Sequence, residues 1–110
     1  MASDPAFVKH VCDNVREQVG EVSYLPMFGE YAIYVGAKVV ALVCDNQLFL
    51  KPTDSGRAHL GTPVEAPPYP GARSYFLLDE ELDDADRLSA LFLATEAALP
   101  RPKPKKMKKA

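Results

Sequence analysis

Residues 27–51 read MFGEYAIYVGAKVVALVCDNQLFLK, and this stretch decides the fold of the 110-residue chain. It holds three largely apolar runs separated by short turn segments, Tyr31–Val35, Val39–Cys44 and Gln47–Lys51. Runs of this length, bounded by Gly, Asp or Asn, are typical of antiparallel strands. Val39–Cys44 is apolar at every position, so we expect a central strand covered on both faces, by helices or by a second subunit.

The turns in this stretch predict its register. Asp45-Asn46 is a two-residue loop of the type that tolerates positive φ, which pairs Cys44 with Gln47 and therefore Leu42 with Phe49. The segment 36–38 (GAK) is expected to separate the first two strands.

Two longer helices are expected to flank this sheet. Asp4-Pro5 is a helix start, with an N-cap followed by proline at the first position, and Gly20 is placed to end the helix. Its buried face is predicted from the apolar spacing of Phe7, Val8, Val11, Cys12, Val15 and Val19. The last helix opens at Asp79 or Asp83, and its predicted buried face comprises Leu82, Ala85, Leu88, Leu91, Phe92, Thr95 and Leu99.

The remaining segments are shorter. Residues 21–24 and 74–78 are expected to be strands, and residues 53–60 a short helix closed by Gly61. Residues 62–71 contain four prolines, so we expect an extended loop there and no central strand.

The predicted fold class is therefore α+β, an antiparallel sheet flanked by N- and C-terminal helices, in one domain spanning residues 1–99. Residues 100–110 alternate proline with lysine or arginine and hold little apolar area, so we expect a disordered or polyproline-like tail.

Composition favours a soluble cytoplasmic protein. Hydrophobic residues make up 47% and charged residues 25%, no run is long enough for a membrane span, and the first residues lack the pattern of a signal peptide. Two cysteines are too few for the disulfide framework of a small secreted domain.

The net charge of −2 hides a division along the chain. Residues 1–99 hold all fifteen acidic residues and seven basic ones, whereas the tail holds six basic residues and no acid. The basic residues Arg101, Lys103, Lys105, Lys106, Lys108 and Lys109 are the predicted nucleic-acid contacts, weak and non-specific, because such contacts depend on phosphate charge and fall with salt. The alternative is a solubilising tail.

The residues that could carry chemistry have simpler interpretations. Cys12 and Cys44 could be a redox pair or a nucleophile, but buried cysteine usually packs as a small hydrophobe. His10 and His59 stand in no ligand-spaced cluster, so no metal or other cofactor is predicted. The acidic residues 79–86 suit a helix start, and could also attract a basic partner or the tail. No sequence motif of a hydrolase, nucleotide-binding protein or metalloenzyme is present, so we predict that the protein is not an enzyme.

Met27, Phe28 and Gly29 form the candidate protein-interaction site. Two large apolar residues followed by glycine, directly after Pro26, predict a sharp corner at which a partner can approach the backbone. The alternative is a strand entry whose Met and Phe fill the core.

Three segments together resemble the N-terminal domain of the TfoX (Sxy) competence regulators: MFGEYAIY, then VGAKVVALVCDNQLFLKPT, then PYPGARSYFLLDEELDDADRLSALFLATEAAL. The resemblance covers about residues 22–99 and extends plausibly through the first helix; Met27, Phe28, Gly29 and Lys51 are motif positions. It implies an α+β fold like that of secretion chaperones. It also implies a non-enzymatic regulator, since two-domain members control competence genes together with a cyclic-AMP-responsive activator.

The chain departs from two-domain members in two ways. The Pro/Lys tail stands where their helical second domain begins, and Glu30 stands where many relatives have a second glycine. The expected function is a regulatory protein-interaction domain linked to transcriptional control or competence, with a protein partner or a second copy of the chain. Nucleic-acid binding through the tail is the alternative.

Overall fold

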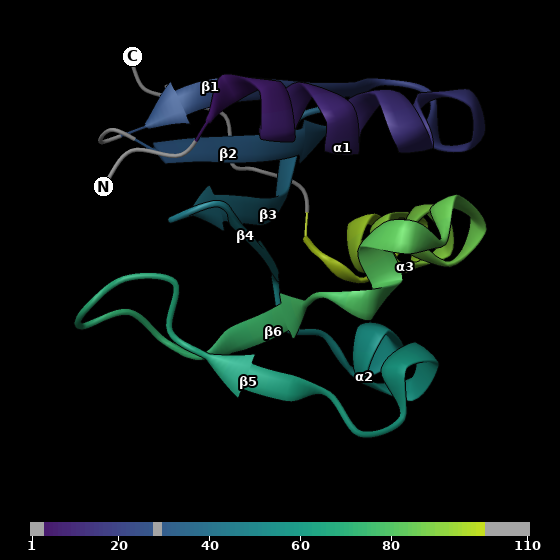
Figure 1. The fold of residues 1–110 in the computed structure, drawn as a ribbon. Helices are drawn as coiled ribbons and strands as arrows, with labels where there is room; N and C mark the ends of the chain where they lie inside the picture. The colour runs from purple at the N-terminus through teal and green to yellow at the C-terminus, as the bar shows by residue number, and fades with distance from the viewer. Residues whose placement is uncertain (1–3, 28–29, 101–110) are drawn as a thin grey trace, which may run out of the picture.

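A computed structural model describes residues 4–27 and 30–100, which form one antiparallel six-stranded sheet in the order β1-β2-β3-β4-β6-β5. The strands are β1 (Val22–Met27), β2 (Glu30–Val35), β3 (Lys38–Cys44), β4 (Gln47–Leu50), β5 (Val64–Ala66) and β6 (Tyr75–Leu78). The described helical elements are α1 (Pro5–Val19), α2 (Asp54–Leu60), the short 3-10 helix η1 (Glu80–Asp83) and α3 (Ala85–Ala98). The predicted α+β class is confirmed (Figure 1).

The first helix begins and ends where its sequence predicts. The Asp4 carboxylate accepts a hydrogen bond from the Ala6 amide at 2.9 Å, and Gly20 has a φ of 91° that suits glycine at a helix end. Its buried side chains are Val8, Val11, Cys12 and Val15, and Phe7 and Val19 pack partly buried beside them.

The predicted β3–β4 hairpin is also confirmed. Cys44 pairs with Gln47 and Leu42 with Phe49, and the two turn residues, 45 and 46, have φ values of 55° and 57°. The preceding turn is shorter than expected. It contains Gly36 (φ 60°) and Ala37, while Lys38 already belongs to β3 and pairs with Val35.

A β-bulge in β3 changes which of its side chains share a face. The register with β2 shifts between Ile33, which pairs with Ala41, and Tyr34, which pairs with Val39. The extra residue is Val40, and both Val40 and Ala41 pack into the core under the helices.

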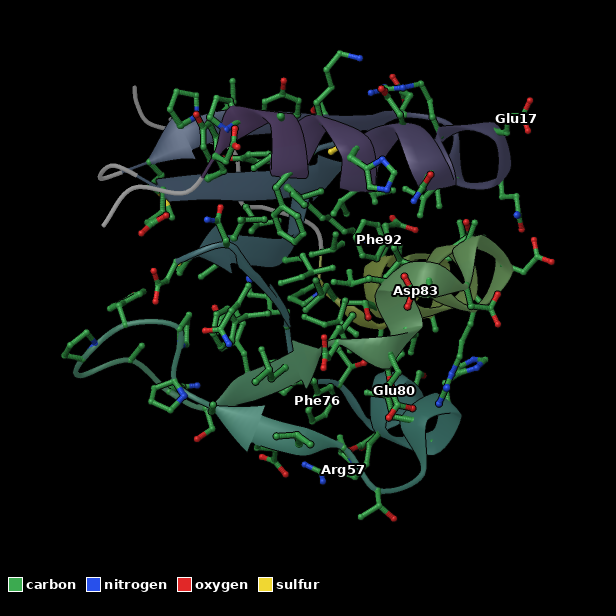
Figure 2. The ribbon with its side chains drawn as sticks, viewed as in Figure 1. Glu17, Arg57, Phe76, Glu80, Asp83 and Phe92 are labelled. Carbon is green, nitrogen blue, oxygen red and sulfur yellow. The ribbon has the colours of Figure 1, made fainter. Side chains whose placement is uncertain are left out.

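Helices α1 and α3 cover one face of the sheet, here called the helix face (Figure 1). Its core includes Phe76 of β6 and Phe92 of α3, both fully buried (Figure 2). Helix α2 is tied to the neighbouring strands by Arg57, whose guanidinium lies 5.1 Å from the Phe76 ring centre and 3.0 Å from Glu65 Oε2.

The opposite face, here called the second face, carries a separate buried cluster of Ala32, Leu42, Cys44 and Phe49. Partly buried residues surround this cluster: Tyr34, Val39, Ala66, Tyr75 and Leu77. Within the described part of the chain, no helical side chain belongs to it. The central strand β3 is thus buried on both faces, as expected, with helices accounting for one of them.

Three further segments differ from the sequence predictions. β1 extends through Pro26, because it is an edge strand in which a missing N–H costs no ladder bond. Residues 64–66 form β5, at the opposite edge and between prolines, inside the segment expected to be a loop. The last helix opens at Asp84, whose carboxylate accepts from the Arg87 amide at 3.1 Å; the residues expected to open it, Asp79 and Asp83, flank or end η1.

Helix α3 ends at Ala98, and the basic tail 101–110 lies outside the described residues, so the predicted domain boundary stays a prediction. No helix in residues 4–27 or 30–100 is long and apolar enough to cross a bilayer.

Candidate functional site

A cleft of about 750 Å³ lies on the second face, at the end of the sheet where β3 turns into β4. This is a volume typical of ligand and peptide sites. Its walls come from three parts of the chain that are well separated in sequence, around residues 27–31, 42–45 and 68–70: Met27, Glu30, Tyr31, Leu42, Cys44, Asp45, Pro68, Tyr69 and Pro70.

Strand pairing brings these walls together. Met27 ends β1 and pairs directly with Glu30 at the start of β2, so both stand at the mouth of the cleft. Across the next ladder, Tyr31 pairs with Val43, which places Glu30 beside Cys44. The segment 68–70 follows β5 and closes the opposite side.

Hydrogen bonds fix the turn that supplies Asp45. The Asp45 amide donates to Glu30 Oε2 at 3.3 Å, and the Asp4 amide donates to Asn46 Oδ1 at 2.7 Å. The turn is therefore attached both to β2 and to the start of α1. Asp45 and Glu30 hold two carboxylates at one rim of an otherwise largely apolar cleft.

Exposed apolar side chains surround the same cleft. Tyr69 is 54% exposed and Met27 38%. In β1, Val22 and Tyr24 pack on the helix face, so Leu25 and Met27 point to the second face by strand alternation. Leu25 is 56% exposed. The second face thus presents a row of apolar groups that water contacts.

The two cysteines lie on opposite faces of the sheet, which argues against a redox pair. Cys12 packs in the helix-face core, and burial raises the pKa of its thiol to about 11. Cys44 lies on the floor of the cleft, where burial, and then the nearby Glu30 carboxylate, raise the pKa of its thiol. Both thiols are protonated at neutral pH and pack as apolar groups.

The histidines and the acidic residues 79–86 take no part in the cleft. His10 is exposed on α1, 3.3 Å from the Asn14 amide nitrogen, and His59 is exposed on α2. Asp84 caps α3, and Glu81 accepts from the Asp79 amide at 3.0 Å. Among residues 4–27 and 30–100, no group of three or more His, Cys, Asp or Glu side chains is arranged to hold a metal ion.

Of the predicted interaction residues, the structure places Met27 at the cleft, while Phe28 and Gly29 lie outside the described residues. The predicted nucleic-acid contacts, Arg101, Lys103, Lys105, Lys106, Lys108 and Lys109, lie outside them too. Sequence reasoning missed the acidic rim and Tyr69. The signal available for Tyr69 was an aromatic residue between two prolines in a segment expected on the surface.

Comparison with known proteins identifies a family and a relative. The family model described as the TfoX N-terminal domain matches residues 14–99. An uncharacterized 12.7 kDa protein from the trpE 5' region of Spirochaeta aurantia is 45% identical over 112 residues, covering 98% of this chain and 93% of that protein. Both matches span the sheet, the cleft and α3. The chain therefore belongs to the TfoX N-terminal domain family.

Proposed function

We propose that this protein is a cytoplasmic, non-enzymatic protein-interaction domain that serves transcriptional control of the competence type, and that the cleft on the second face is its binding surface. The observation that carries the proposal is the juxtaposition of exposed Met27 and Tyr69 with the rim carboxylates Glu30 and Asp45. Exposed apolar groups rimmed by charge are typical of protein contact sites.

The chemistry of the cleft supports binding over catalysis. A nucleophile needs a lowered pKa or an adjacent base, whereas the pKa of the Cys44 thiol is raised by burial and by Glu30. Neither histidine lines the cleft. The link to transcription rests on the family, whose two-domain members are regulators, and the cleft supplies the surface through which this domain would act.

Affinity capture with matched variants tests the proposal. The wild-type chain is expected to capture a stoichiometric protein partner, and Tyr69→Glu is expected to abolish the capture by placing a charge in an apolar contact. Leu93→Glu is the control, since Leu93 is also exposed (41%) but lies on α3, on the helix face. Direct titration of the purified partner then confirms the contact.

Two results would count against the proposal: equal loss in both variants, or no captured protein together with a monomeric mass in analytical ultracentrifugation. A dimeric mass that Tyr69→Glu converts to monomer would identify the partner as a second copy of the chain.

The charge of the tail favours a second candidate function, non-specific nucleic-acid binding. Six cations in contact with phosphates predict a steep salt dependence, with a log–log slope of about −5. Fluorescence anisotropy of labelled duplex DNA should show that slope for the wild-type chain and no binding for a variant with all six basic residues replaced by glutamine. Binding retained by the variant would exclude the tail as the contact.

A further inference from the structure

The described chain ends beside the second face. Leu99 still packs against the core of the helix face, but Pro100 lines a small cavity with Val39 and Lys51 at the start of β3. Figure 1 shows the chain leaving α3 and running to the sheet beside β3. Val39 packs with the cluster of the second face. The described chain therefore ends, at Pro100, near the end of β3 that is opposite to the cleft.

An apolar path connects this point to the cleft. Because of the bulge, Val39, Leu42 and Cys44 share the second face, and Leu42 and Cys44 also form the floor of the cleft. The five steps along the strand from Val39 to Cys44 span about 16 Å in extended geometry. The five steps from Pro100 to Lys105 also span about 16 Å in a polyproline II helix.

The tail has the chemistry to follow this path. In PRPKPKKMKKA, prolines 100, 102 and 104 alternate with Arg101, Lys103 and Lys105, a pattern that favours polyproline II and leaves few backbone donors to satisfy. Prolines in this conformation dock on apolar and aromatic grooves. Tyr34 packs beside Val39 on the second face, and Tyr69 stands at the cleft.

The charge of the tail is complementary to that of the cleft. At the calculated spacing, Lys105 and Lys106 arrive at the rim that holds Glu30 and Asp45. Lys51 and Arg73 repel the basic tail along this path. Lys51 lines the small cavity beside Pro100. Arg73 lies near Tyr75, because its charge partly offsets the rise in the pKa of the Tyr75 hydroxyl. Glu30 and Asp45 bring two carboxylates together where the path reaches the cleft.

We infer that residues 101–110 bind in cis along the second face. The prolines lie on the apolar path formed by Val39, Leu42 and Cys44, and Lys105 and Lys106 pair with Glu30 and Asp45. The tail is then the resident occupant of the cleft, and an external partner must displace it or present a similar basic, proline-containing segment. The inference rests on the cleft identified under the proposed function. Weak contacts between the tail and the cleft are enough to keep the tail bound, because the short tether gives the tail an effective concentration on the order of mM at the cleft.

The acidic residues at the start of α3 are the competing site. They lie at the other end of α3 from Pro100, about 21 Å away for a helix of that length. Glu80 and Asp83 project from η1 and are exposed (Figure 2), so a matched double substitution there changes charge without touching the cleft.

The test is paramagnetic relaxation in the full-length chain. Met107→Cys carries a nitroxide label; the native thiols are buried, which directs the label to the tail. At about 0.01 M salt, the amide signals of Glu30, Asp45 and Tyr69 are expected to be lost, and about 1 M salt should restore them by screening. The double substitution E30Q/D45N should restore the same signals at low salt, whereas E80Q/D83N should not.

Several results would overturn the inference: signal loss at residues 79–86, absence of any localised loss, or loss unaffected by E30Q/D45N. Loss in unlabelled ¹⁵N-chain mixed with nitroxide-labelled ¹⁴N-chain would assign the contact to a second copy and also overturn it. None of these outcomes affects capture of a partner at the cleft, which the Tyr69→Glu variant tests. Failure of the inference is therefore distinguishable from failure of the proposed function.

Discussion

Replacing Lys38 by methionine tests how much the contacts of Lys38 with the end of α3 contribute to the free energy of unfolding. Lys38 Nζ donates to the Glu96 carbonyl at 2.9 Å and lies 3.2 Å from Glu96 Oε2. Helix α3 has no basic residue in its last turn, so Lys38 is the cation that meets its C-terminal carbonyls.

The magnitude follows from the exposure of the two groups. The Lys38 side chain is 17% exposed, so its bond to a helix-terminal carbonyl should contribute about 1–2 kcal/mol. The Glu96 carboxylate is 34% exposed, and solvent screening limits the ion pair to about 0.5 kcal/mol. Methionine keeps the apolar stem and removes the charge, so Lys38→Met should lower the free energy of unfolding by about 1–2 kcal/mol.

Urea denaturation measures this loss, and thermal unfolding should show a fall of about 4–8 °C for each kcal/mol. Glu96→Gln is the matched control, because it keeps the carbonyl bond and removes only the ion pair; its cost should be about 0.5 kcal/mol and should vanish at high salt. Equal costs for the two variants, or no cost for Lys38→Met, would refute the reasoning that the backbone carbonyl dominates.

Three further predictions concern stability. Gly36→Ala should lower the free energy of unfolding, measured by urea denaturation, by about 1–2 kcal/mol. Nothing lies within 4 Å of the added Cβ, so the loss comes from holding alanine at a φ of 60°. An unchanged urea midpoint would contradict this. Asp84→Ala should cost about 1 kcal/mol by removing the cap of the Arg87 amide, whereas Asp83→Ala, which has no capping role, should be close to neutral in the same assay. Burial raises the pKa of Cys12 from 9.0 to about 11, so the unfolded chain releases this proton at lower pH than the folded chain. Stability should therefore fall by about 2–3 kcal/mol as pH rises through that window, and Cys12→Ala should flatten this part of the pH profile; parallel profiles would contradict the assignment.

The cleft links the family assignment to a mechanism of recognition. The matched region, residues 14–99, includes every strand and α3, so the cleft is built by the family domain itself. In the proposal the tail lies outside that domain and regulates access to it. In this way the binding surface stays occupied until a partner competes for it.

Sequence predicted best those features whose causes are local. The start of α1 depends on Asp4 and its neighbours, and the β3–β4 register depends on two turn residues with positive φ, so both were correct. The start of α3 was misplaced because the predicted caps, Asp79 and Asp83, lie among several acidic residues, and the three-dimensional path of η1 selects Asp84.

The sequence by itself determined the fold class, the family, the central strand and the division of charge between domain and tail, because hydrophobic spacing and turn chemistry act over a few residues. Only the tertiary structure decided what meets at the cleft. The bulge in β3 sets which side chains share the second face, and non-local pairing places Met27, Glu30, Asp45 and Tyr69 around one cavity. Such contacts depend on the closure of long loops between strands, which no local pattern encodes.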